Sequence, residues 1–197
     1  MAIKIPGVRN IRGADTADII AEQIALCESN LRTIDNVAFF RKEREKRDEI
    51  NRRLRGCNDF LGMAGSRKDG CLYREVNITS DVPMVCEHAI PVTALVSLYE
   101  EGFASFEKIA FYPVALISKM SDKRLGNLGL VKSGHDNEID FKRYNTAGIR
   151  IETHEGNEID TETWSIKDHW ALLKSTPPLA NIKAKVRKIL EERGNVV

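Results

Sequence analysis

A carboxylate and an imidazole stand side by side in an apolar stretch of this sequence. The stretch runs from Val82 to Val92 and contains the pair Glu87-His88, with Pro91 three residues after the histidine. The flanking apolar residues predict an extended, partly buried backbone. Burying such a pair costs free energy unless another group compensates it. A divalent cation, a catalytic partner or an ordinary hydrogen bond in the core would each do so, and the residues alone leave these alternatives open.

The two residue types suit the hydrolysis of a phosphodiester bond. A neutral imidazole can take a proton from water near neutral pH, which makes the water a nucleophile. A hard divalent cation with carboxylate, amide or imidazole ligands stabilises the negative charge that grows on the phosphorus and on the leaving 3′ oxygen. One cation is enough where a histidine acts as the base.

Hydrophobic periodicity predicts the elements that would position this pair. Apolar residues recur at helical spacing over 16–32 and about 35–55, and β-forming residues predict strands over 71–79, 84–90 and 114–117. The other predicted elements are helices over 93–101, 106–111, 161–174 and 179–192, a helix from Ser118 or Ser121 to Leu128, a polar loop over 131–142, and a strand over 148–153 followed by a turn near 155–157.

These elements predict an α+β protein with two regions. Residues 1–70 are expected to form a helical N-terminal region. Residues 71–197 are expected to form a small core of strands and helices with a helical C-terminal cap.

The order of elements around the pair resembles the ββα-metal core of HNH (His-Me finger) endonucleases. In that family the first strand ends in an acidic residue followed by histidine, commonly with proline three positions on, as Glu87, His88 and Pro91 do here. The second strand of the family leads into a helix, and here the strand 114–117 leads into a helix that contains Ser121-Asp122-Lys123-Arg124.

The segments 118–129 and 143–148 are also similar to segments of phage-encoded HNH-type proteins.

The resemblance implies metal-dependent cleavage of DNA. His88 would activate the water, and Glu87 would help to hold Mg²⁺ or Mn²⁺. The helix after the second strand supplies a further ligand in the family, for which we expect Asp122, with Asn127 and His135 as alternatives. Asp122 could instead be a carboxylate that is stabilised by the N-terminus of its helix.

Basic residues in several places could contact the phosphates of a nucleic acid. We expect such contacts from the pairs Arg67-Lys68 and Lys123-Arg124, and from Arg143, which could alternatively be a structural ion-pair partner. The segment 41–55 has eight basic and four acidic residues. It fits either a solvated helix face with internal ion pairs or a helix that contacts phosphates.

The composition sets further limits. The net charge of +1 neither requires nor rules out a nucleic acid, and the residues do not distinguish DNA from RNA. The four cysteines are widely spaced, so we expect free thiols and no structural zinc site. No apolar run approaches the roughly 18 residues of a membrane span, and the N-terminus lacks the apolar core of a secretory signal. We therefore expect a cytoplasmic protein without a membrane partner.

Two functions remain after this reading of the sequence. The first is a metal-dependent endonuclease, which would form a homodimer if its target site is symmetric. The second is a non-catalytic phage factor that binds nucleic acid or protein, in which Glu87 and His88 only stabilise the core.

Overall fold

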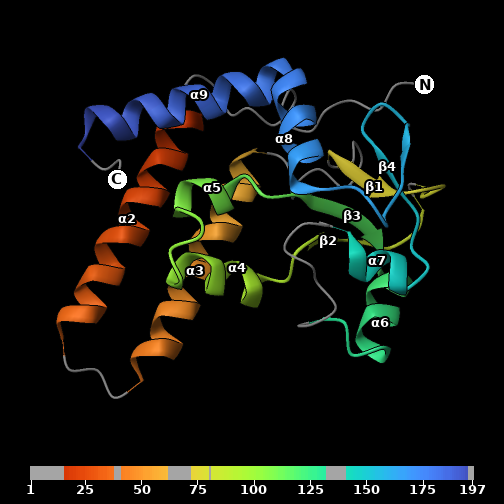
Figure 1. The fold of residues 1–197 in the computed structure, drawn as a ribbon, viewed down its shortest axis with the longest axis horizontal. Coiled ribbons are helices and arrows are strands. Elements are labelled where there is room, and N and C mark those ends of the chain that lie inside the picture. The colour runs from red at the N-terminus through yellow and green to blue at the C-terminus, as the bar shows by residue number, and fades with distance from the viewer. Residues whose placement is uncertain (1–15, 38–40, 62–71, 80, 132–140, 195–197) are drawn as a thin grey trace.

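The predicted α+β class is confirmed, with helices at both ends of the chain (Figure 1). The computed structural model describes residues 16–37, 41–61, 72–79, 81–131 and 141–194. The helices are α2 (Thr16–Asn36), α3 (Lys42–Leu61), α4 (Val92–Glu100), α5 (Phe106–Ala110), α6 (Lys119–Asn127), α7 (Lys142–Thr146), α8 (Ile166–Ser175) and α9 (Pro177–Glu192). The strands are β1 (Tyr73–Glu75), β2 (Met84–His88), β3 (Val114–Ser118), β4 (Ile151–Thr153) and β5 (Glu158–Ile159).

Several helices differ from the sequence-based expectation. Helix α3 spans Lys42–Leu61 instead of about 35–55, and α2 continues to Asn36. Helix α8 begins at Ile166 instead of 161, because Ser165 and Asp168 form a capping box that fixes its first turn. Helix α7 begins at the last residue of the expected loop 131–142 and ends before the expected strand 148–153. Its five residues include Arg143 and Tyr144, both of which are buried.

The sheet is mixed and has the strand order β2-β3-β1-β4-β5. Strand β3 runs antiparallel to β2 and parallel to β1, and β1 runs antiparallel to β4. Every residue of β3 is buried, which agrees with the uninterrupted apolar run that predicted this strand. The parallel pairing of β1 with β3 requires a crossover, and the chain between them includes β2, α4 and α5.

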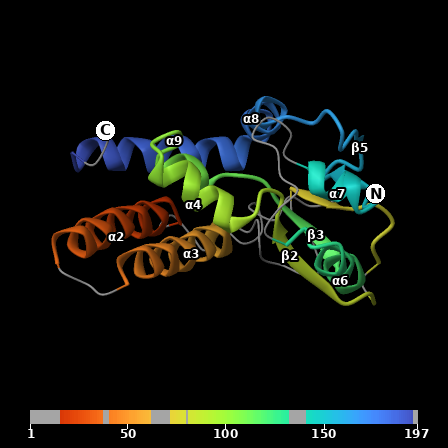
Figure 2. The same cartoon turned by 60° about the horizontal axis from the view of Figure 1, so that its bottom comes forward.

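Helices α2 and α3 form a hairpin, and α9 packs against α2 (Figures 1 and 2). Helix α2 contributes Ile20 and Ile24 to the core, and α9 contributes Val186 and Leu190. Exposed ion pairs join the same two helices. The described residues of the N-terminal and C-terminal regions therefore share one hydrophobic core, while the expected boundary between the regions, 70/71, lies outside the described residues.

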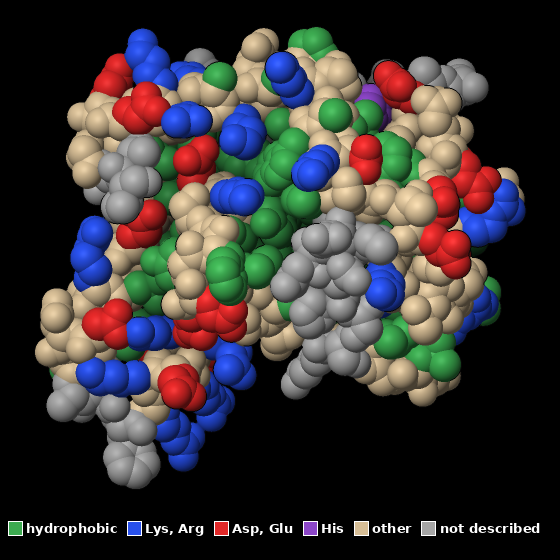
Figure 3. Space-filling view, in the orientation of Figure 1, with side chains coloured by type: hydrophobic (Ala, Val, Ile, Leu, Met, Phe, Trp, Pro, Cys, Tyr) green, Lys and Arg blue, Asp and Glu red, His purple; other side chains and the backbone are tan. Residues whose placement is uncertain are grey.

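The surface of the α2–α3 hairpin carries charges of both signs (Figure 3). Most charged residues of the segment 41–55 are exposed, and Arg44 forms an ion pair with Asp48 one turn later. This arrangement has the features of a solvated helix face with internal ion pairs.

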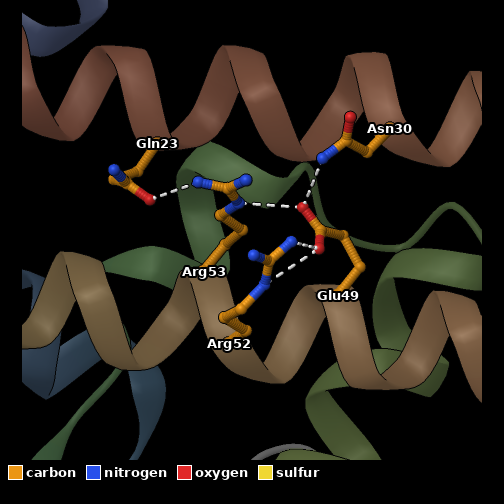
Figure 4. A network of polar contacts seen from close by, with 5 residues as sticks. All are labelled: Gln23, Asn30, Glu49, Arg52 and Arg53. Atoms are coloured by element: carbon orange, nitrogen blue, oxygen red, sulfur yellow. Dashed lines mark hydrogen bonds and ion pairs between the residues drawn. The ribbon is translucent and has the colours of Figure 1, made fainter.

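One carboxylate of this segment is buried between the two helices (Figure 4). Oε1 of Glu49 accepts hydrogen bonds from Asn30 Nδ2 and Arg53 Nε, both at 2.8 Å. Oε2 accepts a bond from Arg52 Nε at 3.1 Å, and Arg53 Nη1 donates to Gln23 Oε1 at 2.8 Å. Because Gln23 and Asn30 belong to α2 and the other residues belong to α3, the network fixes how the two helices are aligned.

Replacing Glu49 should therefore destabilise the fold. In Glu49→Ala, the partly buried Arg53 and Asn30 lose their acceptor, which should lower the free energy of unfolding by about 2–3 kcal/mol. The matched control is Asp48→Ala, because the Asp48 side chain is 70% exposed and its loss should cost less than about 0.5 kcal/mol. Urea denaturation measures both values, and equal effects would contradict a structural role for the network.

Candidate functional site

The pair Glu87-His88 ends strand β2, beside the start of β3. The antiparallel register pairs His88 with Val114 at one end and Met84 with Ser118 at the other. Helix α6 follows β3 without a linker and packs against both strands. The described structure thus contains the order strand, strand, helix that the sequence suggested, with α4 and α5 inserted between the strands.

The first turn of α6 is held by a neighbouring strand. Ser118 is the N-cap, and its side chain accepts a hydrogen bond from the Ser121 backbone. The Glu75 carboxylate of β1 accepts bonds from the Ser118 N–H and the Ser121 hydroxyl, both at 2.7 Å. These bonds satisfy donors at the helix N-terminus. They fix the turn that contains Asp122.

Arg143 organises the end of β2 from inside the protein. Its Nε donates to the carbonyl of Ala89 at 2.9 Å, and its Nη1 donates to the carbonyl of Leu130 at 3.1 Å. Its Nη2 donates to Glu87 Oε1 at 2.6 Å and to the carbonyl of His88. The residue has no exposed surface. Arg143, predicted to contact nucleic acid, therefore has the other role that the sequence allowed, a structural ion pair.

Tyr144 lies beside the guanidinium, which is 5.2 Å from the centre of its ring. Its hydroxyl is 3.4 Å from the carbonyl oxygen of Glu87, to which it donates. Burial raises the pKa of Tyr144 far above its ordinary value, and the negative charges of Glu87 and Asp122 raise the pKa further, whereas Arg143 lowers it. Both carboxylates are therefore close enough to this hydroxyl to influence its pKa.

His88 is a neutral imidazole at pH 7. Burial lowers the pKa of His88 to about 4, and the positive charges of Arg55 and Arg143 act in the same direction. Arg55 comes from α3, in the basic segment 41–55, and its side chain is exposed. The surroundings of the imidazole are therefore partly buried and basic.

The remaining predicted residues are divided between the surface and the undescribed parts of the chain. Lys123 and Arg124 are exposed on α6, and Arg124 Nη1 donates to the carbonyl of Ala147 at 3.1 Å. Asn127 is exposed at the end of the same helix. Arg67, Lys68 and His135 lie outside the described residues.

The donors at this site suit a hard cation that is only partly ligated by protein. Within the described residues, no three His, Cys, Asp or Glu side chains converge as a metal site. The hydrogen bond from Arg143 engages Oε1 of Glu87, and Oε2 has no hydrogen-bond partner among these residues. Mg²⁺ commonly takes one or two carboxylates and completes its shell with water and substrate phosphate. Glu87 and Asp122 are carboxylates, the type of side chain that such a set uses.

His169 is fully buried and has a structural role. A carbonyl oxygen can only accept, so His169 Nε2 donates to the Phe111 carbonyl at 2.8 Å. Its Nδ1 therefore accepts from the Tyr73 hydroxyl at 3.0 Å, and the Tyr73 oxygen accepts from Trp164 Nε1 at 3.2 Å. The neutral ring is fully hydrogen-bonded, and burial lowers the pKa of His169 to about 4.

Comparison with family models, with curated proteins and with solved structures gives no match to this chain. Among the described residues, no helix combines the length and the apolar character that crossing a bilayer requires.

The neutral state of His169 predicts a loss of stability in mild acid. Its pKa is 6.5 in the ordinary state and about 4 in the fold, so the unfolded chain binds more protons between these values. Stability should fall as the pH drops below 6.5, and this one group should cost about 2 kcal/mol at pH 5 relative to pH 8.

Chemical denaturation at pH 8 and at pH 5 measures this effect. His169→Gln retains a donor and an acceptor but does not titrate, so its stability should change less between the two pH values. An equal change in the wild type and the variant would contradict the assignment.

Because the buried guanidinium of Arg143 donates several hydrogen bonds, we expect that lysine cannot replace this residue. In Arg143→Lys, one ammonium replaces a guanidinium that bonds three carbonyls and Glu87, and the free energy of unfolding should fall by about 2–4 kcal/mol. Arg150→Lys is the matched control, because Arg150 is exposed and its partner Glu158 is also exposed. Its stability in urea denaturation should stay close to that of the wild type, and a similar loss in both variants would refute the special role of Arg143.

Proposed function

We propose that this protein hydrolyses phosphodiester bonds of DNA with the help of a divalent cation. The observation that carries the proposal is the antiparallel β2–β3 pair followed directly by α6. It supports a site in which Glu87 and His88 end the first strand and Asp122 lies in the first turn of the following helix. This is the arrangement that the resemblance to HNH endonucleases implies.

His88 is the general base in this proposal. Its imidazole is already neutral at pH 7, so its ring can accept a proton from the attacking water. A pKa of about 4 makes it a weak base in the absence of substrate. The negative charge of a phosphate beside the ring would raise the pKa of His88, because an opposite charge favours the protonated form. Substrate binding would thus strengthen the base.

Glu87 and Asp122 are the proposed ligands of Mg²⁺ or Mn²⁺. When bound, the cation would neutralise negative charge on the phosphate. Arg143 holds Glu87 by Oε1 and thereby directs Oε2 for ligation, as partners of metal ligands commonly do.

Exposed basic side chains would contact the DNA backbone. Arg55, Lys123 and Arg124 are exposed on α3 and α6, and Arg67 and Lys68 stay predictions. A symmetric DNA target would favour a homodimer, and the same phosphate contacts would also accept RNA.

One observation favours the alternative function, a non-catalytic factor that binds nucleic acid or protein. Arg143 already neutralises Glu87 and bonds the carbonyl of His88. The charged pair therefore has a structural partner within the protein, which is the arrangement that a purely structural pair would have.

Nicking of supercoiled plasmid in Mg²⁺ or Mn²⁺ distinguishes the two functions. The wild type should cut, and His88→Ala should be slower by at least about 100-fold, because general-base catalysis contributes 10²–10⁴-fold. Asp122→Asn should also lose at least about tenfold, because it removes a charged metal ligand. The matched control is His154→Ala, which alters a histidine beyond β4 and should keep the wild-type rate.

Circular dichroism of each variant establishes that it is folded. Failure of the wild type to cut modified or unmodified DNA, or an undiminished rate in folded His88→Ala, would reject the nuclease and leave the binding factor.

A further inference from the structure

Residues of helices α8 and α9 line an open groove of about 390 Å³. Its floor is apolar and consists of Trp170, Leu173, Ala180 and Ala184. On the face drawn in Figure 3, Lys and Arg side chains surround exposed apolar surface near these two helices. Helices α8 and α9 lie on the opposite side of the molecule from α6, the helix that carries Asp122 (Figure 1).

Helix α9 has apolar residues beyond those that pack against α2, and these additional residues form part of the groove floor. The side chains of Leu179, Ile182 and Val186 are buried in the core. Ala180 and Ala184 stand one turn apart beside that buried row and line the groove. Small side chains at this spacing let the backbone of another helix approach closely.

All the charged residues that line the groove are basic, namely Lys174, Lys183 and Arg187. Lys174 forms no ion pair with the described residues. Arg187 pairs with Glu191 on the surface, at 2.9 Å, and such an exposed pair exchanges partners at little cost. Lys183 lies 3.7 Å from the carboxylate of Glu107. The lining itself contains only basic charged residues, which favours an acidic partner.

A larger hollow of about 980 Å³ lies between α2, α3 and α5, but its charges do not favour an acidic partner. Its charged lining residues are four acidic and four basic: Glu28, Asp35, Glu43, Glu100, Arg32, Lys42, Lys46 and Arg47.

The surroundings of Trp170 favour a peptide over a nucleic acid. The ammonium of Lys183 lies 5.6 Å from the centre of the indole ring, and the rings of His169 and Tyr112 lie at 4.9 and 5.7 Å. A single-stranded nucleic acid needs an open aromatic face on which a base can stack. Here protein groups surround the ring, and the alanines and Leu173 complete a floor that suits aliphatic side chains.

We propose that this groove binds an acidic amphipathic helix of a partner protein. Apolar side chains spaced i, i+3/i+4 and i+7 on the partner would lie on the floor. Its carboxylates would face Lys174, Lys183 and Arg187. The proposal concerns a second site and holds whether or not the chain cleaves DNA.

A synthetic helical peptide with leucine at those positions and glutamate elsewhere tests the proposal by fluorescence anisotropy. The full chain should bind the labelled peptide with saturation, and a peptide of the same composition with its leucines scrambled around the helix should bind at least about tenfold more weakly, a difference of 1.4 kcal/mol. The affinity should also fall with increasing salt.

Two alanine variants test the location. Ala184→Glu puts a like charge and extra volume into the groove and should weaken binding at least about tenfold. Ala171→Glu makes the same change on an exposed position of α8 that does not line the groove, and it should bind within about twofold of the wild type. Equal binding of both peptides, an unchanged affinity in Ala184→Glu, or binding of a single-stranded oligonucleotide in place of the peptide would each overturn the proposal.

Discussion

The candidate site depends on the hydrogen bonds that the buried guanidinium of Arg143 donates. A charge without exposed surface is tolerated only when its donors are occupied. Here the donors meet three carbonyls and one carboxylate, from the end of β2 and from the residue Leu130 after α6. The guanidinium thereby ties together the strand that carries Glu87 and His88, the chain beyond the helix that carries Asp122, and α7. The chemistry proposed for this region uses groups that this one side chain holds in place.

A second carboxylate supports the same region from β1. Glu75 fixes the start of α6 through Ser118 and Ser121, while Arg143 fixes the end of β2. The two acidic residues therefore have different roles in one small sheet. Glu75 satisfies backbone and hydroxyl donors at a helix N-terminus. One carboxylate oxygen of Glu87 accepts a hydrogen bond from the Arg143 guanidinium. Its other oxygen has no hydrogen-bond partner among the described residues.

Much of the architecture followed from local patterns, whereas the partners within the site did not. Periodicity predicted β3 and α9 because each has a clear apolar signature. It missed α7, whose single turn contains Arg143 and depends on tertiary contacts. The position of Glu87 at a strand end was predicted, but its partner lies 56 residues away in the chain. The spacing of residues in a sequence does not reveal an ion pair between positions so far apart. The charge of Arg55 near His88 likewise arises from the packing of α3.

The packing of α9 against α2 has a consequence for synthesis of the chain. Lys185 pairs with Asp18, and Arg193 pairs with Glu22, so contacts at this interface join residues separated by 167 and 171 positions. The ribosome must release nearly the whole described chain before α9 can cover Ile20 and Ile24. Until then, the early hairpin exposes an apolar face of the kind that chaperones bind and that promotes aggregation. Translation speed and chaperone supply should therefore influence the yield of folded protein.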